Sequence, residues 1–97
     1  MQFLPELKKF LKKEGIIYTV RGYDMVEKDV HIEGIGVCHR EPLGEVLDLK
    51  DLEQYVPQSG FPSLESWVKK IRRFIPFGGR MWLYKVEAKT RIGGVEK

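Results

Sequence analysis

The sequence predicts a small α+β domain with a mixed sheet of about five strands, an N-terminal helix, and two helices before the last strand. Apolar residues recur at three- and four-residue spacing in residues 4–11 and 64–74, which is typical of helices with one buried face. Residues 16–21, 29–33 and 81–88 are rich in β-branched and aromatic residues or alternate in polarity, and they indicate strands.

The first half of the chain is expected to form a helix and three strands. The helix begins near Pro5 and ends at Gly15, because glycine readily adopts the left-handed conformation found at helix C-termini. A strand over residues 16–21 leads through a polar connection to an alternating strand over residues 29–33. A glycine-rich turn then precedes a third strand over residues 37–40.

Proline and glycine interrupt the middle of the chain. Pro42 and Gly44 separate the third strand from residues 45–47, which are expected to form one more short strand. Asp48 predicts the cap of a helical turn that ends at Pro57.

The third helix and the last strand have the clearest patterns. Ser63 is a good N-cap, because its hydroxyl can accept a hydrogen bond from the free amides of the first turn. The apolar face of the helix is expected to contain Leu64, Trp67, Val68, Ile71 and Phe74. Residues 81–88 have apolar side chains on both faces, which indicates a central strand.

Length and composition indicate the number of domains, the character of the surface and the redox compartment. With 97 residues the chain is expected to form one domain, residues 1–97, of which residues 89–97 form a frayed tail. Charged residues make up 32% with a net charge of +3, which indicates a soluble surface and is weak support for nucleic-acid binding unless the cations cluster. A single cysteine, Cys38, excludes an internal disulfide framework and indicates a reducing compartment.

The remaining expectations concern location and source. The N-terminal segment has no long apolar run, so we expect neither a signal peptide nor a membrane span, and we expect a cytoplasmic monomer. The chain lacks asparagine and is rich in lysine and glutamate, a composition typical of a thermophilic source, and we expect an archaeal one.

The first strand offers a candidate binding site. Alternation places Thr19 and Arg21 on one face, where a hydroxyl and a guanidinium suit a phosphate or a base edge. The alternative is an ordinary edge-strand arginine paired with a nearby glutamate, since most charged residues lie at the solvated surface.

A cluster of cations lies within and just after the third predicted helix. No acid occurs between Ser66 and Val86, a span that contains Lys69, Lys70, Arg72, Arg73 and Arg80. On a helix Lys69, Arg72 and Arg73 share a face, while Lys70 lies to one side. Such a face can neutralise phosphates, with Tyr23 as a candidate stacking surface, or it can simply be the solvated side of the helix.

Cys38 and His39 are not expected to form a site. A zinc site needs about four ligands, and one cysteine with two histidines does not supply them. Adjacent residues on a strand point to opposite faces, so a thiol–imidazole pair is not expected either. The glycines around Ile35 lack the third glycine of a dinucleotide fingerprint, so no metal or cofactor is expected.

The order of motifs resembles the ASCH domain family, whose members are related to the PUA fold. A helix, Gly15 and the Thr19-Val20-Arg21 strand match the start of the family pattern, and residues 29–32 and 36–40 resemble its next strands. The closest similarity is Gly60-Phe61-Pro62-Ser63-Leu64-Glu65-Ser66-Trp67, followed by the last strand. The likeness spans residues 3–88.

The resemblance implies a PUA-like pseudo-barrel with helices at its ends and a cleft near Thr19 and Arg21. Some family members are amidohydrolases that act on an acetylated cytidine with a lysine, the strand threonine and a glutamate. Only Thr19 matches directly here: the family lysine is absent from Ile17, Lys13 is the candidate substitute, and the glutamate is Glu33, Glu41 or Glu45.

The leading hypothesis is therefore an RNA-binding module without catalysis. Thr19, Arg21 and Tyr23 would contact a base or phosphate, and the backbone would be held by Lys69, Arg72, Arg73 and Arg80. The alternatives are an enzyme on modified nucleosides, with Thr19, Lys13 and Glu45 in the cleft, and a protein-interaction domain whose basic helix docks an acidic partner.

Overall fold

The computed structural model describes residues 2–76 and 78–89. In chain order its elements are α1 (Pro5–Glu14), β1 (Ile16–Arg21), β2 (Lys28–Ile32), β3 (Gly36–Glu45), the 3-10 helix η1 (Leu49–Gln58), α2 (Leu64–Phe74) and β4 (Trp82–Ala88). The predicted α+β class and the order of helices and strands are confirmed. The predicted tail lies outside the described residues from residue 90 onward.

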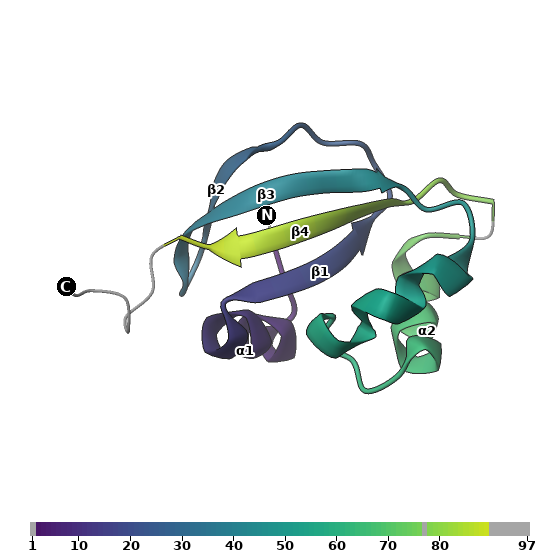
Figure 1. The fold of residues 1–97 in the computed structure, drawn as a ribbon, viewed down its shortest axis with the longest axis horizontal. Helices are drawn as coiled ribbons and strands as arrows, with labels where there is room; N and C mark the ends of the chain where they lie inside the picture. The colour runs from purple at the N-terminus through teal and green to yellow at the C-terminus, as the bar shows by residue number, and fades with distance from the viewer. Residues whose placement is uncertain (1, 77, 90–97) are drawn as a thin grey trace.

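The sheet over the described residues has four strands in the order β1-β4-β3-β2, and all neighbours are antiparallel (Figure 1). The prediction of a mixed sheet of about five strands is therefore wrong. The sheet is not a closed barrel, because β1 and β2 are its two free edges. The predicted central position of β4 is confirmed, since β4 pairs with both β1 and β3.

The segment expected to start a fifth strand is instead partly a continuation of β3. Residues 45–47 were expected to start a new strand after Pro42 and Gly44, but Glu45 still belongs to β3 and pairs with Trp82. The register shifts between Pro42 and Gly44, and Gly44 has φ 131°. A glycine at such a bulge lets the strand bend and continue, so glycine and proline mark an irregularity here and not an end.

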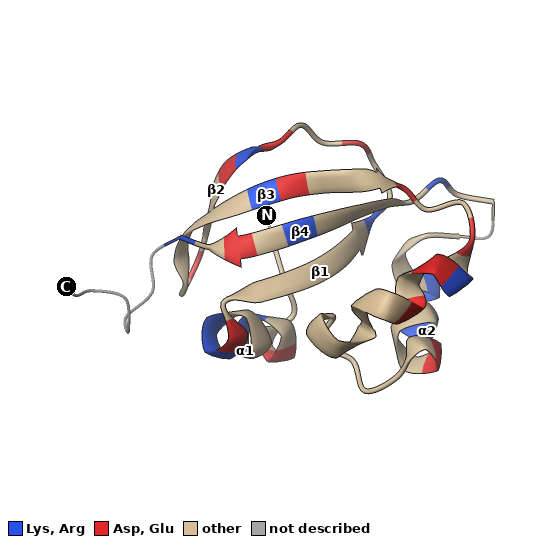
Figure 2. Cartoon of the chain, viewed as in Figure 1, with Lys and Arg blue, Asp and Glu red and all other residues tan. Residues whose placement is uncertain are grey.

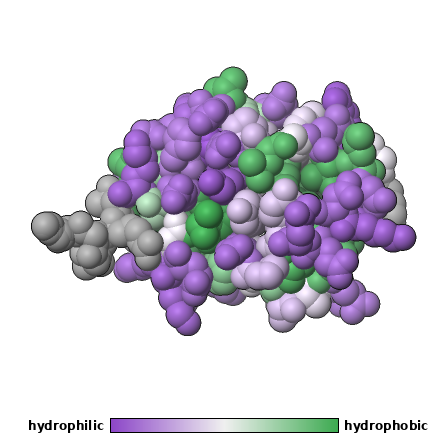
Figure 3. Space-filling model, in the orientation of Figure 1, coloured by the Kyte–Doolittle hydropathy of each residue, from purple (hydrophilic) through white to green (hydrophobic). Residues whose placement is uncertain are grey.

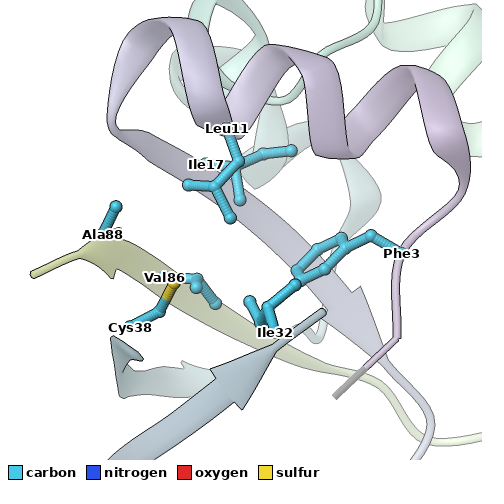
Figure 4. Close-up of a cluster of buried hydrophobic side chains, with 7 residues drawn as sticks. All are labelled: Phe3, Leu11, Ile17, Ile32, Cys38, Val86 and Ala88. Atoms are coloured by element: carbon cyan, nitrogen blue, oxygen red, sulfur yellow. The ribbon is translucent and has the colours of Figure 1, made fainter. Parts of the chain in front are cut away.

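Each face of the sheet carries its own apolar core. Beneath α1 lies the cluster that Figure 4 shows: Phe3, Leu11, Ile17, Ile32, Cys38, Val86 and Ala88. On the opposite face, side chains from η1, α2 and β4 pack together, including Leu52, Trp67, Ile71 and Leu83. Strand alternation produces this division, because Ile17 belongs to the first core while Tyr18 and Val20 pack on the second.

The predicted caps at Gly15, Asp48 and Ser63 are confirmed, whereas the helical turn expected to end at Pro57 continues to Gln58. Gly15 closes α1 with φ 83°, and its N–H donates to the carbonyl of Leu11 at 2.7 Å. The Asp48 side chain accepts from the Lys50 amide at 3.0 Å, and Ser63 accepts from the Ser66 amide at 3.2 Å. Local capping chemistry thus sets the entry of both later helices.

The connection between β1 and β2 lies over the sheet and is held there by two buried side chains. The Tyr84 hydroxyl donates to the Tyr23 carbonyl at 2.8 Å and accepts from the Met25 amide at 2.6 Å. Arg40 donates to the Val26 carbonyl through Nε at 3.1 Å and through its terminal nitrogen at 2.8 Å. These bonds position Tyr23 at the end of β1.

The surface is mixed in polarity. Figure 3 shows that apolar side chains reach one face of the molecule in separate patches among hydrophilic ones. Phe74 was expected on the buried face of α2 but is 69% exposed, so that part of the prediction is wrong. In the part of the chain that the structure describes, no helix has the length and apolar character needed to cross a bilayer.

Candidate functional site

A groove of about 630 Å³ lies along the free edge of β1. The N-terminal segment and the first turns of α1 form one wall through Gln2, Phe3, Leu4 and Leu7. Helix α2 and the chain after it form the other wall, which runs from Trp67 to Arg80. The floor contains Thr19, Val20 and Arg21, followed by the turn through Gly22 and Tyr23. The expected meeting of the first strand and the basic helix at one concave surface is therefore found.

The turn before α2 closes one end of the groove. Ser59 is buried; its hydroxyl donates to the Val56 carbonyl at 2.8 Å and accepts from the Phe61 amide at 3.1 Å. Gly60 has φ 87°, and a Cβ there would lie 2.6 Å from Cδ2 of Leu7. Phe61 stacks on Trp67 with ring centroids 6.4 Å apart. Glycine at residue 60 thus permits the close approach of this turn to α1.

Arg21 is the cation at the floor of the groove. It donates to the Gln2 carbonyl at 2.8 Å, and its guanidinium carbon lies 4.9 Å from the centre of the Phe3 ring. Its Nε is buried and has no hydrogen-bond partner among the described residues. Burial lowers the pKa of Arg21, an effect that Tyr23 partly offsets.

Among the residues that the structure describes, no carboxylate neutralises Arg21. The ion pairs within residues 2–76 and 78–89 join other residues, so the expected alternative, an edge arginine paired with a glutamate, is not found. Thr19 lies on the same face of β1, is only 8% exposed, and also lines the groove. The floor therefore combines a hydroxyl with an uncompensated guanidinium.

Lys70 is the cation of α2 that lines the groove. The groove-facing side of the helix also contains Trp67, Ile71 and Phe74, which are three, one and four residues away from it. Sequence reasoning placed Lys70 to one side, because it grouped the cations with one another. The better signal was the spacing of Lys70 from Trp67 and Phe74, which puts these three on one helix face.

The other cations proposed for α2 do not line the groove. Lys69, Arg72 and Arg73 are absent from its walls, and Lys69 and Arg73 are exposed elsewhere on the helix. The rim is aromatic instead, with Tyr23 59% exposed and Phe74 69% exposed. Phe74 was assigned to the core, so its place at the rim was missed.

Arg80 lines the groove but is paired. Its Nε donates to Oε2 of Glu45 at 2.8 Å, and a terminal nitrogen donates to Oε1 at 3.0 Å. Its guanidinium carbon lies 4.8 Å from the centre of the Trp82 ring. The hydrogen bond raises the pKa of Arg80 and lowers that of Glu45. The charge of Arg80 is therefore compensated, unlike that of Arg21.

The three residues named for a hydrolase do not share one pocket. Lys13 is exposed in the last turn of α1 and does not line the groove that contains Thr19. Glu45 is held by Arg80. Of the other glutamates, Glu33 lines a separate cavity of about 380 Å³, and Glu41 lies 3.6 Å from the amine of Lys85.

Cys38 and His39 point to opposite faces of β3, as predicted. Cys38 is buried in the first core, and burial raises the pKa of its thiol. His39 lies between Asp29 and Glu27, and each ring nitrogen is 2.7 Å from a carboxylate oxygen. Within residues 2–76 and 78–89, no group of three or more His, Cys, Asp or Glu side chains is placed to hold a metal.

These geometric findings are the basis for a functional argument, since comparison with family models, curated proteins and solved structures finds no match for this chain.

Proposed function

We propose that the groove beside β1 binds a nucleotide unit of single-stranded RNA without catalysing a reaction. Arg21 and Lys70 hold the phosphate, Thr19 contributes a hydroxyl, and Tyr23 and Phe74 offer rings for a base at the rim. The resemblance to the ASCH domain family belongs to this proposal, because the cleft that it implies coincides with the Thr19 and Arg21 strand.

The observation that carries the proposal is the state of the Arg21 guanidinium. The guanidinium is partly buried and contacts the Gln2 carbonyl and the Phe3 ring, but no carboxylate among the described residues offsets its lost hydration. Its Nε has no partner among the described residues, and its planar guanidinium fork belongs to a side chain that lines the concave site. Phosphate oxygens match that fork, and hydrogen bonds between two charged groups are the strong ones.

The size and lining of the groove support a nucleotide over a bare ion. Its volume of about 630 Å³ lies in the usual range for small-molecule sites, roughly 300–1,000 Å³. Aromatic rings at its rim suit bases of any identity, because every base has a π-face. Outside the groove, Lys69 and Arg73 are exposed on α2 and extend the cationic surface for neighbouring phosphates.

Titration of a fluorescein-labelled, mixed-sequence, single-stranded RNA at low and moderate salt tests the proposal. We expect salt-dependent binding that weakens about tenfold or more in Arg21→Ala, because a hydrogen bond to a charged group contributes about 1.5–3 kcal/mol. Lys70→Ala should weaken binding less and reduce the salt dependence.

Lys28→Ala is the matched control, because it removes an exposed cation from β2, at the opposite edge of the sheet. It should leave the affinity within about twofold of wild type, since surface substitutions away from a site change little. Equal losses in Arg21→Ala and Lys28→Ala would refute the groove as the binding site. Absence of salt-dependent binding by the wild-type protein would refute RNA as its ligand.

A further inference from the structure

The Arg80–Glu45 pair is the part of the groove that a phosphate site does not explain. Arg80 lines the groove and its side chain is 69% exposed, yet both oxygens of the Glu45 carboxylate accept hydrogen bonds from it. A carboxylate at this place reduces the positive charge available to an anionic ligand. The pair also belongs to two segments that are distant in sequence, the end of β3 and the connection before β4.

The sheet register places this pair next to Arg21. Trp82 of β4 pairs with Arg21 on one side and with Glu45 on the other. Residues directly opposite each other on neighbouring strands direct their side chains to the same face. Arg21, Trp82 and Glu45 therefore form one row across three strands, about 10 Å from end to end at two strand spacings. Arg80 lies over the ring in the middle of that row.

We propose that the Arg80–Glu45 pair is a latch that the phosphate of the bound ligand opens. The phosphate replaces the carboxylate on the Arg80 guanidinium, so that Arg21 and Arg80 hold the ligand together. Glu45 occupies Arg80 in the free protein and thereby limits how strongly a phosphate binds there. This inference rests on the proposed function and adds to it Arg80 as a third cation and Glu45 as a carboxylate with the same sign of charge as the ligand.

The chemistry of the exchange is balanced, because one anion that accepts two hydrogen bonds replaces another on the same guanidinium fork. Arg80 stays charged throughout, and no proton has to move. The pair is exposed, so its net contribution to stability is small and a phosphate can displace the carboxylate. Arg80 lies two residues before the first residue of β4, so its side chain can turn without breaking the β-ladder.

Ligands with and without a phosphate differ in whether they displace Glu45 from Arg80. A ligand without a phosphate, or with a single weak acceptor, leaves Arg80 on Glu45 and gains only Arg21 and Lys70. A ligand with a phosphate gains a third cation. The latch therefore lowers the affinity for phosphate-bearing ligands by the free energy of an exposed ion pair and leaves the affinity for neutral aromatic ligands unchanged.

Glu45→Gln tests the latch with the labelled RNA used for the groove. Removing the competing charge should tighten binding about two- to fivefold, the range that corresponds to an exposed ion pair. Glu41→Gln is the matched control: it makes the same substitution on the same strand, but its side chain pairs with Lys85 on the opposite face. It should change the affinity by less than the Glu45 variant does.

The same comparison in an Arg80→Gln background separates the latch from a general effect of charge. If Glu45 acts through Arg80, adding Glu45→Gln to Arg80→Gln should leave the affinity unchanged. Arg80→Gln alone should also lower the slope of log affinity against log salt by about 0.7, the value for one phosphate contact to a single strand.

Three outcomes decide the question. Tighter binding by Glu45→Gln that disappears without Arg80 supports the latch. Equal effects of Glu45→Gln and Glu41→Gln, or an effect that persists without Arg80, overturn the latch and leave the groove itself as the binding site. Absence of binding by both the wild-type and the Glu45→Gln proteins overturns the proposed function together with the latch.

Discussion

The two edges of the sheet differ in whether their charged side chains have partners of opposite charge. At the β2 edge, His39 lies between the carboxylates of Asp29 and Glu27, and Lys89 lies 3.1 Å from Asp29. Figure 2 shows acidic and basic residues interspersed along β2, β3 and β4. At the β1 edge, Arg21 lines a groove with no carboxylate partner among the described residues. Compensated charges make a solvated surface, whereas an uncompensated cation in a concave site favours an anionic ligand.

The two edges also differ in how closely side chains pack around a glycine with positive φ. Gly34 lies in the turn between β2 and β3 with φ 86°, and a Cβ there would meet nothing within 4 Å. Gly60 has nearly the same φ, 87°, but a Cβ there would meet Leu7 in the wall of the groove. The same conformation is thus open to solvent at one edge and tightly packed at the other.

The largest effect is expected from alanine at these two glycines. Gly60→Ala should lower the free energy of unfolding by about 2–3 kcal/mol, because the left-handed conformation is strained and Leu7 has to move. Gly34→Ala should lower it by only about 1 kcal/mol, from the conformation alone. Urea unfolding measures both, and equal losses would show that the groove end is not tightly packed.

An intermediate effect is expected on Arg21, where stability and binding should separate. Arg21→Met keeps the aliphatic stem and removes the uncompensated charge, so the free energy of unfolding should change by no more than about 1 kcal/mol. Binding of the labelled RNA should nevertheless fall about tenfold or more. Urea unfolding and the RNA titration measure the two quantities on the same protein.

A loss of stability above about 2 kcal/mol in Arg21→Met would contradict this separation. It would mean that the hydrogen bond to Gln2 and the contact with Phe3 make Arg21 a structural residue. The comparison between the two edges would then no longer distinguish a binding site from a solvated surface.

The smallest effect is expected from pH at the β2 edge. Hydrogen bonds to Asp29 and Glu27 raise the pKa of His39, so the protonated form is favoured in the folded protein. Its contribution to stability is complete below the ordinary histidine pKa of about 6.5 and is lost as pH rises through the raised value. The urea midpoint should therefore fall slightly across that window, and His39→Gln should remove this part of the pH dependence.

His31→Gln is the control for that measurement, because it replaces the other histidine of the chain without touching the cluster. The decline attributed to His39 should remain in it. Asp29 contributes in the acid range: hydrogen bonds to His39 and Lys89 lower its pKa, so its contribution is lost as pH falls through the lowered value. A midpoint that rises with pH above about 6.5 would contradict the assignment to His39.

The sequence was a good guide wherever one short segment decides the outcome. The caps at Gly15, Asp48 and Ser63 were predicted because each depends on the conformation or hydrogen bonding of a few adjacent residues. The central strand was predicted because apolar residues on both of its faces have to be covered. The predicted β1 residues Thr19 and Arg21 also lie in the groove.

The errors arose where a residue has two physical roles. Gly44 can end a strand or allow a bulge, and only pairing with β4 selects the bulge. Phe74 falls on the apolar spacing of α2, yet the residue after it, Ile75, enters the core, and the Phe74 ring lies at the rim of the groove. Grouping the α2 cations by charge drew attention to Lys69, Arg72 and Arg73 and away from Lys70.

Hydrophobic spacing, capping residues and the alternation of strands were enough to derive an α+β domain and the face on which Arg21 lies, because these depend on neighbours a few residues apart. The tertiary structure alone decided that the sheet stays open, that α2 presents Lys70 to β1, and that Glu45 compensates Arg80 but nothing described compensates Arg21. Those outcomes join residues far apart in the chain, and no periodicity encodes which distant side chain a charge will meet.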